Sequence, residues 1–551
     1  MLKLLGVAAL FGAVHAQNAT LPRIDLGYEI YQAANFNSTG NFYNFSNIRY
    51  AAPPVGQLRF APPHAPEKNR SSVNKGQTSR ICPQASPAWG QVATAFITST
   101  LLGLPYNSTQ IYTPSGANSS SQVPPADPRE SEDCLFLDVF APKSVLDKAG
   151  KGHGAAVLVW IYGGGYTGGS KNNNPAGLIA ASGNSSSGDV IYVAMNYRLG
   201  ALGFQAGPTF NAEGGTSNLA LYDQRFALEW VQKYIHLFGG DKNRVTVFGE
   251  SAGGGSIMHQ ITAYGGLKGK VPFQKAIPQS PGWSPVQSNV QTEDTYQKFL
   301  RLTNSKSLAD LRALSSEAII RANSQQITHD ATYGGYVYGP VVDGNFVPAQ
   351  PGQLLAQGRF DKNVQVMAGH NANEGQYFTP PYIQTNEGLV AQLKIAFPFT
   401  PQQSIDYISQ TLYPPVFNGS YPYRDQYSRA RLVIAEGIFT CNTRYLATAQ
   451  GNKTYNYLFA VPPAFHGQDI AYTYYTGGAL SQSVANRTVA IVLQQFITSF
   501  AEEGRPTAAG VRPFPIYGSD ANLLKLNVTG IDVVHDSNAN VRCAWWQKAL
   551  Y

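Results

Sequence analysis

The stretch "RVTVFGESAGGGS", residues 244–256, sets a serine between glycines at the end of an apolar run. The run before Gly249 is typical of a buried strand, and the residues from Ser251 onward begin as a helix would. Gly and Ser are also common in ordinary turns. Ser251 is nevertheless the only serine with glycine both two residues before it and two residues after it. A strand-to-helix turn of this kind presents the serine hydroxyl, so Ser251 is a candidate nucleophile.

The same alternation of apolar runs and helical patterns continues along the chain. Residues 218–240 have helical periodicity and end at glycine. Other runs read as buried strands, at residues 155–165, 190–198 and 364–371. Continuous apolar strands separated by helices predict an α/β fold with a mostly parallel sheet covered on both faces. Ligands bind at the carboxyl ends of such strands, which here precede the loops after Ile161, Phe248 and Ala368.

The N-terminus has the three parts of a secretory signal. Lys3 supplies a positive charge, "LLGVAALFGAV" an apolar core, and Ala16 a small residue before Gln17. The apolar run is too short to span a bilayer as a helix, and no later stretch has the length and apolar character of a span. We therefore expect a signal peptide over residues 1–16 and a single secreted domain over residues 17–551.

Asn-x-Ser/Thr sequons agree with secretion, because such acceptors belong on the surfaces of secreted proteins. Their number predicts a glycoprotein. The acceptors are Asn18, Asn37, Asn44, Asn69, Asn107, Asn118, Asn184, Asn418, Asn452, Asn486 and Asn527.

The four cysteines fit the same compartment. An even, small number in a secreted chain predicts two disulfides rather than a metal site, and no pair has the C-x-x-C spacing of zinc ligands. Spacing alone leaves the three possible pairings open. The cysteines are Cys82, Cys134, Cys441 and Cys543.

Two segments upstream of Ser251 depart from the strand–helix pattern. Residues 113–131 are rich in Pro and Ser without core periodicity, so we expect a long surface loop. Apolar side chains recur at helical spacing over residues 89–101, with polar residues between them. This amphipathic helix either packs on the core or covers the site as a lid. Its apolar positions are Trp89, Val92, Ala93, Phe96, Ile97 and Leu101.

A serine nucleophile needs a base, a carboxylate that orients the base, and donors for an oxyanion. The segment "WIYGGGY", residues 160–166, follows a predicted strand. Its three glycines can turn their N–H groups toward a substrate without side chains in the way. Since this loop and the Ser251 turn both follow strands, we expect them to meet at one edge of the sheet.

Longer stretches carry a family resemblance. The chain resembles the type-B carboxylesterase/lipase family, the cholinesterase-like branch of the α/β-hydrolases, and most of all its secreted fungal carboxylesterases. The combination of "FGESAGG" and "EDCL" is highly specific to this family. The resemblance implies the α/β-hydrolase fold, with a large, mostly parallel sheet and helices on both faces. It rests on "RYAAPPVGQLRFAPP" (49–63), "SEDCLFLDVFAP" (131–142), "NYRLGALGF" (196–204), "VTVFGESAGG" (245–254) and "GPVVDGNFVP" (339–348).

The resemblance places the family's nucleophile at Ser251. It places the oxyanion donors at the main-chain N–H groups of Gly164, Gly165 and Ala252. Many members have a histidine where this chain has Tyr162. Because the donors belong to the main chain, we expect that difference to matter little.

The family's acid falls on Glu374, within "AGHNANEGQYF", and its base on His466, within "FHGQDI". The order Ser, Glu, His is the one this fold uses. His535 is the rival base after Glu374, but no glycine-rich loop surrounds it. Asp343 is the rival acid, in a setting that reads as a turn. Glu250, beside the nucleophile, is expected to shape the local field without transferring protons.

The resemblance also implies scaffold contacts. It pairs Cys82 with Cys134 and Cys441 with Cys543, and it implies the ion pairs Arg49–Glu132 and Arg198–Asp223.

The implied activity is hydrolysis of a carboxylic ester through a Ser-His-Glu acyl-enzyme, with no metal or cofactor. We expect a small-molecule or lipid ester as partner and no stable membrane insertion. The net charge of +7 is small for this length, and the Lys and Arg residues form no cluster in the sequence, so we do not expect nucleic acid as a partner. The alternatives are an interfacial lipase, an acyltransferase with a non-water acceptor, and an idle binding homologue. The family's cholinesterases carry a cation-binding Trp well along the first disulfide loop. The only Trp in that loop here, Trp89, lies close to Cys82, so the resemblance disfavours cholinesterase activity.

Overall fold

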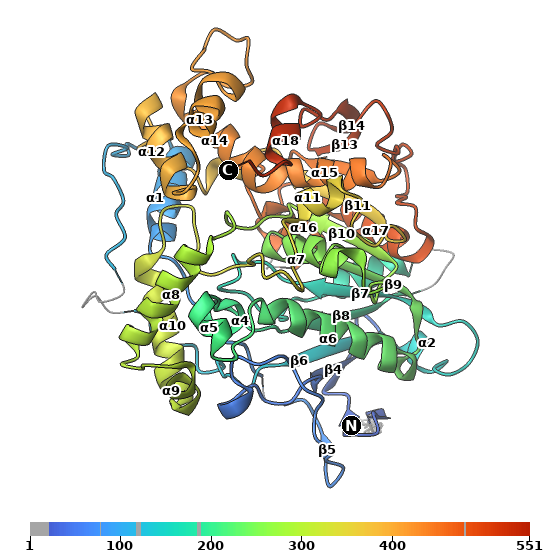
Figure 1. Ribbon diagram of the computed structural model, residues 1–551. Coiled ribbons are helices and arrows are strands. Elements are labelled where there is room, and N and C mark those ends of the chain that lie inside the picture. The colour runs from blue at the N-terminus through green and yellow to red at the C-terminus, as the bar shows by residue number, and fades with distance from the viewer. Residues whose placement is uncertain (1–20, 78, 117–122, 184–188, 479–480, 551) are drawn as a thin grey trace, which may run out of the picture.

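The computed structural model describes residues 21–77, 79–116, 123–183, 189–478 and 481–550. Its main feature is a mixed sheet in the order β14-β13-β12-β11-β10-β9-β7-β8-β6-β4-β3 (Figure 1). The strands from β8 across to β13 are parallel, and antiparallel strands close both edges. The strands are β3 (Asn35–Asn37), β4 (Phe42–Arg49), β6 (Phe136–Pro142), β7 (Ala155–Ile161), β8 (Ile191–Met195), β9 (Gly240–Glu250), β10 (Lys275–Gln279), β11 (Gln365–Asn371), β12 (Tyr455–Phe459), β13 (Asn522–Asn527) and β14 (Gly530–His535).

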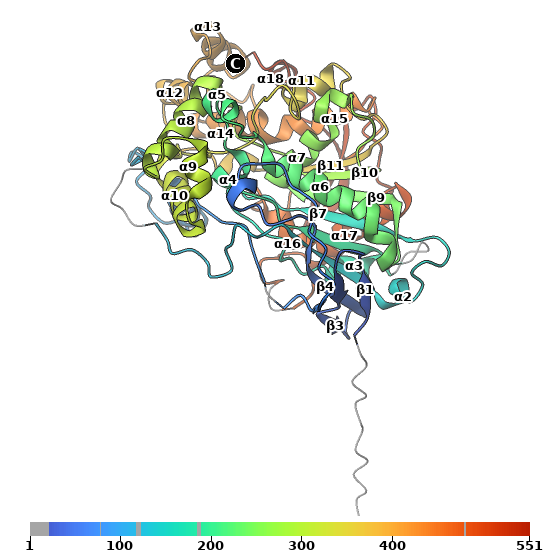
Figure 2. The ribbon, with the colours of Figure 1, turned by 60° about the horizontal axis from the view of Figure 1, so that its bottom comes forward.

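The central strands read as continuous apolar runs because helices cover both faces of the sheet. All of β8, and β7 after its first residue, are buried. Helices α6 (Leu219–Tyr234) and α7 (Ala252–Ile261) lie on one face, and α3 (Ala176–Ser182), α16 (Gln468–Thr473) and α17 (Arg487–Glu503) on the other (Figures 1 and 2). This architecture confirms the expected α/β fold. A small separate sheet joins β1 (Arg23–Asp25), β2 (Ile30–Gln32) and β5 (Val73–Asn74).

A second group of helices lies beyond the carboxyl ends of the parallel strands, at the left and upper left of Figure 1. One long helical run begins there with α14 (Gln426–Ala435), continues through the π-helical turn η6 (Glu436–Thr440) and ends with α15 (Cys441–Ala449), which packs against β11 and β12. The space between this group and the sheet is where a ligand would meet the strand ends. The other members are α1 (Trp89–Leu102), α8 (Asn289–Leu302), α9 (Leu308–Ala313), α10 (Ser316–Asp330), α12 (Asn386–Ala396) and α13 (Gln402–Asp406).

Both expected disulfides are present, Cys82–Cys134 and Cys441–Cys543. The first closes the segment that contains α1, and the second ties the start of α15 to α18 (Val541–Trp546).

One of the two expected ion pairs is confirmed, and the other is wrong. Arg198 binds Asp223 in the interior, with Nη2 2.7 Å from Oδ1. Glu132 binds Arg59 instead of Arg49. The buried Arg59 also donates to the carbonyls of Leu311, Arg312 and Leu314, so it needs a buried carboxylate beside it. The partly exposed Arg49 forms its pair with the next residue, Asp133.

Several expectations concern segments at the surface. The described part of residues 113–131 contains no helix and no extended strand, as expected for a loop. The signal peptide and the acceptors Asn18, Asn118 and Asn184 lie outside the described residues. None of the remaining acceptor asparagines is buried. In the part of the chain that is described, no helix combines the length and apolar character needed to cross a bilayer.

Candidate active site

Ser251 occupies a sharp turn between β9 and α7. Its backbone has φ 59° and ψ −123°, a conformation that is unfavourable for a residue with a side chain and that is found at functional sites. A Cβ on Gly249 would lie 2.4 Å from the carbonyl oxygen of Ile161, and one on Gly253 only 2.0 Å from it. The two glycines that frame the serine are therefore required by the close approach of β7.

His466 and Glu374 meet Ser251 from two other strand ends. Ser251 Oγ and His466 Nε2 are 2.8 Å apart, and His466 Nδ1 lies 2.6 Å from Glu374 Oε2. Glu374 follows β11 and His466 follows β12, both in the parallel part of the sheet that contains β9. The parallel register brings these three side chains together although 215 residues separate Ser251 from His466.

Glu374 is fixed by more than the imidazole. Its Oε1 accepts a hydrogen bond of 2.5 Å from the backbone N–H of Asn371 at the end of β11. With one oxygen held by the main chain, the other faces His466 Nδ1 in a defined direction. The carboxylate can therefore hold the imidazole in the tautomer that leaves Nε2 facing Ser251 Oγ.

The glycine loop after β7 lies against the nucleophile. A Cβ on Gly163 would lie 2.8 Å from Ser251 Cβ, while Gly164 and Gly165 have φ 109° and 61°. Among the described residues, the N–H groups of Gly164, Gly165 and Ala252 donate to no backbone or side-chain acceptor. Three main-chain donors next to Ser251 are thus free to bind a ligand oxygen.

Tyr162 precedes the glycine loop and packs against Tyr197. Its ring stacks on Tyr197 with the centroids 4.3 Å apart, and its carbonyl accepts a 2.6 Å hydrogen bond from the Tyr197 hydroxyl. Tyr162 also accepts from the Tyr197 N–H and donates to its carbonyl through its own hydroxyl. These contacts with Tyr197 therefore fix the start of the glycine loop, and they do not involve the N–H groups of Gly164 and Gly165.

Buried carboxylates set the electrostatics of the site. Burial would lower the pKa of His466, but the charges of Glu250 and Glu374 outweigh it and raise that pKa. Burial raises the pKa of Glu250 to about 8 and, together with the charge of Glu374, the pKa of Asp469 to about 6. The His466 charge and hydrogen bonds lower the pKa of Glu374 in spite of its burial. Of the carboxylates around His466, Glu374 is therefore the one whose charged form the site favours.

Two phenylalanines and one aspartate of the site were missed from sequence. The His466 ring packs against Phe439, centroids 4.3 Å apart, and against Phe378 at 5.1 Å. Phe439 comes from the π-helical turn η6, and such turns are frequent at functional sites, but no local sequence pattern marks it. Asp469, which accepts from Asn371 and Gln279, stands three residues after His466 within "FHGQDI" and could have been noted there.

The rival residues have other contacts. His535 is exposed, and its Nδ1 donates to the carbonyl of Asp520. Asp343 accepts from the backbone N–H groups of Asn345 and Val347, which makes it part of a turn.

One group of potential metal ligands occurs among the described residues, Glu436 with Cys441 and Cys543. Both cysteines are in the disulfide, so the group offers no thiolate to a metal.

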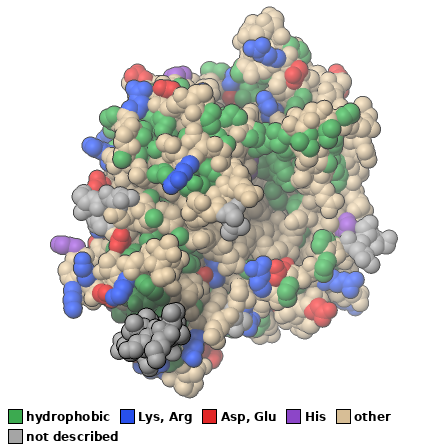
Figure 3. Space-filling model, turned by 180° about the vertical axis from the view of Figure 1, so that it is seen from behind, with side chains coloured by type: hydrophobic (Ala, Val, Ile, Leu, Met, Phe, Trp, Pro, Cys, Tyr) green, Lys and Arg blue, Asp and Glu red, His purple; other side chains and the backbone are tan. Residues whose placement is uncertain are grey.

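Helix α1 is packed on the core at its start and exposed at its end, and its role as a lid stays a prediction. Trp89 and Ala93 are buried, and the Trp89 indole N–H donates to the carbonyl of Gly335 at 2.8 Å. The far end exposes Leu101 and Leu102. Viewed from behind, hydrophobic side chains gather around a hollow at the upper right, the side on which α1 and α12 lie (Figure 3).

Comparisons with known proteins agree with this fold. The carboxylesterase family matches the chain over residues 31–546. The chain is similar to carboxylesterase patB of Penicillium expansum, 41% identical with 97% of each chain covered. A secreted lipase of Arthroderma benhamiae is 32% identical over 76% of this chain and 83% of its own. The crystal structure of Aspergillus niger EstA superposes with a TM-score of 0.77 at 25% identity, covering 96% of this chain and 98% of that one. The chain belongs to the carboxylesterase family and is a carboxylic ester hydrolase of the α/β-hydrolase fold.

Proposed function

We propose that Ser251, His466 and Glu374 hydrolyse the ester through a covalent acyl-enzyme. His466 Nε2 takes the proton of Ser251 Oγ as that oxygen attacks the ester carbonyl, and the imidazolium then gives the proton to the leaving alcohol. Water, activated by the same nitrogen, attacks the acyl-enzyme and releases the acid. The observation that carries the proposal is the pair of hydrogen bonds at 2.8 Å and 2.6 Å that links the three side chains.

The N–H groups of Gly164, Gly165 and Ala252 are the proposed donors to the oxyanion of each tetrahedral intermediate. Their lack of other acceptors supports this role, because donors that are already free and oriented need no rearrangement during the reaction. One such donor contributes about 2.7–4 kcal/mol in a well-studied hydrolase. The start of α7 at Ala252 adds the positive end of the helix dipole.

Secretion as a glycoprotein with one folded domain over residues 17–551 belongs to the same proposal. Two disulfides support an oxidising compartment. The described sequon asparagines are all accessible at least in part, and Asn69, Asn107 and Asn418 are exposed. Intact-mass measurement of the secreted chain before and after enzymatic deglycosylation tests both points, since an N-terminus other than Gln17 or an unchanged mass would contradict them.

The decisive experiment is hydrolysis of p-nitrophenyl esters from acetate to palmitate, below and above their solubility limits, with Ser251→Ala and Ser170→Ala side by side. We expect turnover of short soluble esters that falls by at least about 10⁴-fold in Ser251→Ala and stays unchanged in Ser170→Ala. A fluorophosphonate should react once with the wild-type protein, and the mass of one phosphonyl group should be found on the peptide that contains Ser251. Ester turnover that survives Ser251→Ala would refute the mechanism.

An interfacial lipase is the second candidate, because the exposed Leu101 and Leu102 at the end of α1 offer a face to a lipid surface. The same series separates the two. A rise in rate on long-chain esters only above their solubility limit would favour the lipase. Adding a second alcohol and measuring transesterification against hydrolysis tests the acyltransferase alternative.

A further inference from the structure

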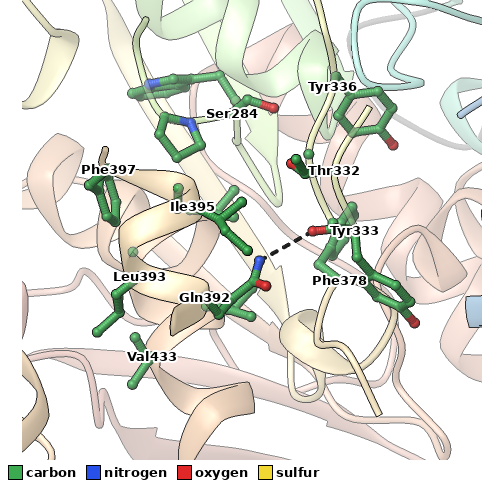
Figure 4. Close-up of a pocket in the computed structure, with 18 of the residues that line it drawn as sticks. Ser284, Thr332, Tyr333, Tyr336, Phe378, Gln392, Leu393, Ile395, Phe397 and Val433 are labelled. Atoms are coloured by element: carbon green, nitrogen blue, oxygen red, sulfur yellow. Dashed lines mark hydrogen bonds between the residues drawn. The ribbon is translucent and has the colours of Figure 1, made fainter. Parts of the chain in front are cut away.

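Two neighbouring compartments lie on the side of Ser251 that faces the helices, and they share part of their lining. The inner one has a volume of about 20 Å³ and is lined by Ser251, Ala252 and Gly165 among others. The outer one has a volume of about 150 Å³ and lies between α12 and the loop 332–336 (Figure 4). The two compartments adjoin, and we place the passage between them at the residues that line both: Trp283, Ser284, Gly334, Tyr336, Phe378 and Ile438.

The walls of the passage are held firmly. The Trp89 ring packs against Tyr336 at 5.9 Å and Phe378 at 6.1 Å between centroids, and Trp89 is itself buried. The Tyr336 ring lies so close to Gly165 that a Cβ there would be 2.1 Å from it. The difference in size between the compartments is therefore fixed by packed aromatic rings.

The volumes translate into the size of the groups that fit. A cavity needs about 10–15 Å³ to hold one water molecule. The inner compartment therefore has room for little more than a methyl-sized group beyond the reacting atoms. A cavity of about 150 Å³ in another protein accepts benzene. The outer compartment thus suits a group the size of one ring.

Charge restricts the ligand further. None of the side chains that line either compartment is an Asp, Glu, Lys, Arg or His. The polar side chains of the outer compartment include four glutamines, and two of these donate to main-chain carbonyls. Gln392 donates to the carbonyl of Tyr333 at 3.3 Å, as drawn in Figure 4, and Gln287 to that of Val337 at 3.2 Å. A charged group would lose its hydration there without gaining a partner of opposite charge.

We propose that the substrates are esters with one short part and one uncharged, apolar part of about ring size, which occupies the outer compartment. This inference rests on the proposed reaction at Ser251. It names the class of substrate. The passage around Tyr336 and Phe378 selects substrates by the size of their groups, and the lining of the outer compartment selects them by charge.

The size test compares esters of similar chemical reactivity: methyl acetate, the isomers benzyl acetate and methyl phenylacetate, and benzyl phenylacetate. We expect kcat/KM for at least one isomer to exceed that for both methyl acetate and benzyl phenylacetate by tenfold or more. The faster isomer shows whether the ring lies on the alcohol or the acyl side. Equal turnover of benzyl phenylacetate and the better isomer would overturn the proposal.

The charge test uses a pair of esters of equal shape on the side thus identified. For the alcohol side the pair is 3,3-dimethylbutyl acetate and acetylcholine, and for the acyl side methyl 5,5-dimethylhexanoate and methyl 4-(trimethylammonio)butanoate. The neutral ester should have a kcat/KM at least tenfold higher. Equal values would overturn the proposal.

A variant with a carboxylate in the outer compartment should weaken its preference for neutral esters. Gln291 lines the outer compartment, and its Oε1 accepts from the backbone N–H of Ser288 at the start of α8. Gln291→Glu keeps that acceptor and adds a carboxylate, so at low salt it should raise the cationic-to-neutral ratio of kcat/KM at least threefold. The matched control Gln357→Glu, at an exposed position outside both compartments, should leave the ratio unchanged. An unchanged ratio in Gln291→Glu contradicts the proposal.

The two proposals fail in different ways. Serine-dependent hydrolysis of p-nitrophenyl acetate without selectivity in either series would remove the substrate inference and leave the mechanism standing. Hydrolysis that does not depend on Ser251 would remove both.

Discussion

The carboxyl edge of the sheet and helix α1 differ in how tightly their side chains are held. Glu374 is 1% exposed, and its two oxygens contact one main-chain N–H and one imidazole. The last residues of α1, Leu101 and Leu102, are 58% and 66% exposed. Both regions border the site, but only the sheet edge is packed on every side.

This difference separates two tasks. Chemistry depends on atoms held within a few tenths of an ångström, which strand ends in a buried sheet provide. Recognition depends on the walls above, where α1 reaches the passage only through Trp89 and its ring neighbours. Four changes, taken in order of decreasing effect on the rate, test how far the two tasks can be separated.

Glu374→Gln should lower kcat on p-nitrophenyl acetate by about 10⁴-fold, by analogy with the corresponding change in a serine protease. The amide can donate to His466 Nδ1 and so favour the wrong tautomer. Asp469→Asn, in the same buried cluster but without a hydrogen bond to His466, should cost far less. Stopped-flow and steady-state kinetics on both variants, with circular dichroism as a check on folding, give the comparison. Equal losses would argue against Glu374 as the orienting acid.

Gly165→Ala should lower kcat by about 10²–10³-fold, the effect of losing one oxyanion donor. The φ of 61° and the Tyr336 ring, which would lie 2.1 Å from the new Cβ, force the loop to move. Gly168→Ala is the matched control, because a Cβ there meets its nearest atom, Gln84 Oε1, at 3.5 Å. Steady-state kinetics on p-nitrophenyl acetate measure both variants. If Gly168→Ala were as damaging as Gly165→Ala, the loop would matter for stability and not for its free donors.

The acid limb of the pH profile should lie above the ordinary range of histidine, since the pKa of His466 is raised and the imidazolium cannot accept the Ser251 proton. Activity therefore falls as the pH drops through that pKa. Glu250→Gln removes a carboxylate whose negative charge favours the imidazolium, so the acid limb should move to lower pH and the rate on that limb should rise. A plot of kcat/KM against pH from about 5 to about 10 measures the shift. Movement to higher pH would contradict the assignment.

Leu101→Ser combined with Leu102→Ser should change kcat/KM on soluble short esters by less than twofold, because these exposed side chains contact neither compartment. The double variant also helps to decide between esterase and lipase. A loss confined to long-chain esters above their solubility limit would assign the end of α1 to an interface. A loss on soluble esters would mean that α1 and the sheet edge act as one unit.

Much of the fold could be read from local patterns. The apolar run before Gly249 and the glycines around Ser251 specify a strand, a tight turn and a helix, and the structure has β9 and α7 at those places. The same is true of β7 and the glycine loop after it. These patterns are readable because each depends on contacts between residues near in sequence or on the requirement for glycine at a close approach.

Partner choice among charged and aromatic groups was not readable in this way. No local pattern pairs Glu132 with Arg59, and the burial of both side chains decides that contact. Phe439 has no motif of its own, and it contacts His466 from the π-helical turn η6, a segment that is distant from Ser251 in sequence.

The linear chain was enough to predict the α/β class, the strained turn at Ser251 and the glycine loop at Gly164 and Gly165. The positions of Glu374 and His466 came from the resemblance of their segments to a known family. Folding in three dimensions decided that these groups lie within hydrogen-bond distance, which carboxylates surround the imidazole, and how wide the passage to Ser251 is. The features predicted from the sequence and those decided by the fold differ in how far apart along the chain the interacting residues are. Turns and strand patterns follow from neighbouring residues, whereas pKa shifts and cavity widths depend on groups that are far apart along the chain and meet only in the folded protein.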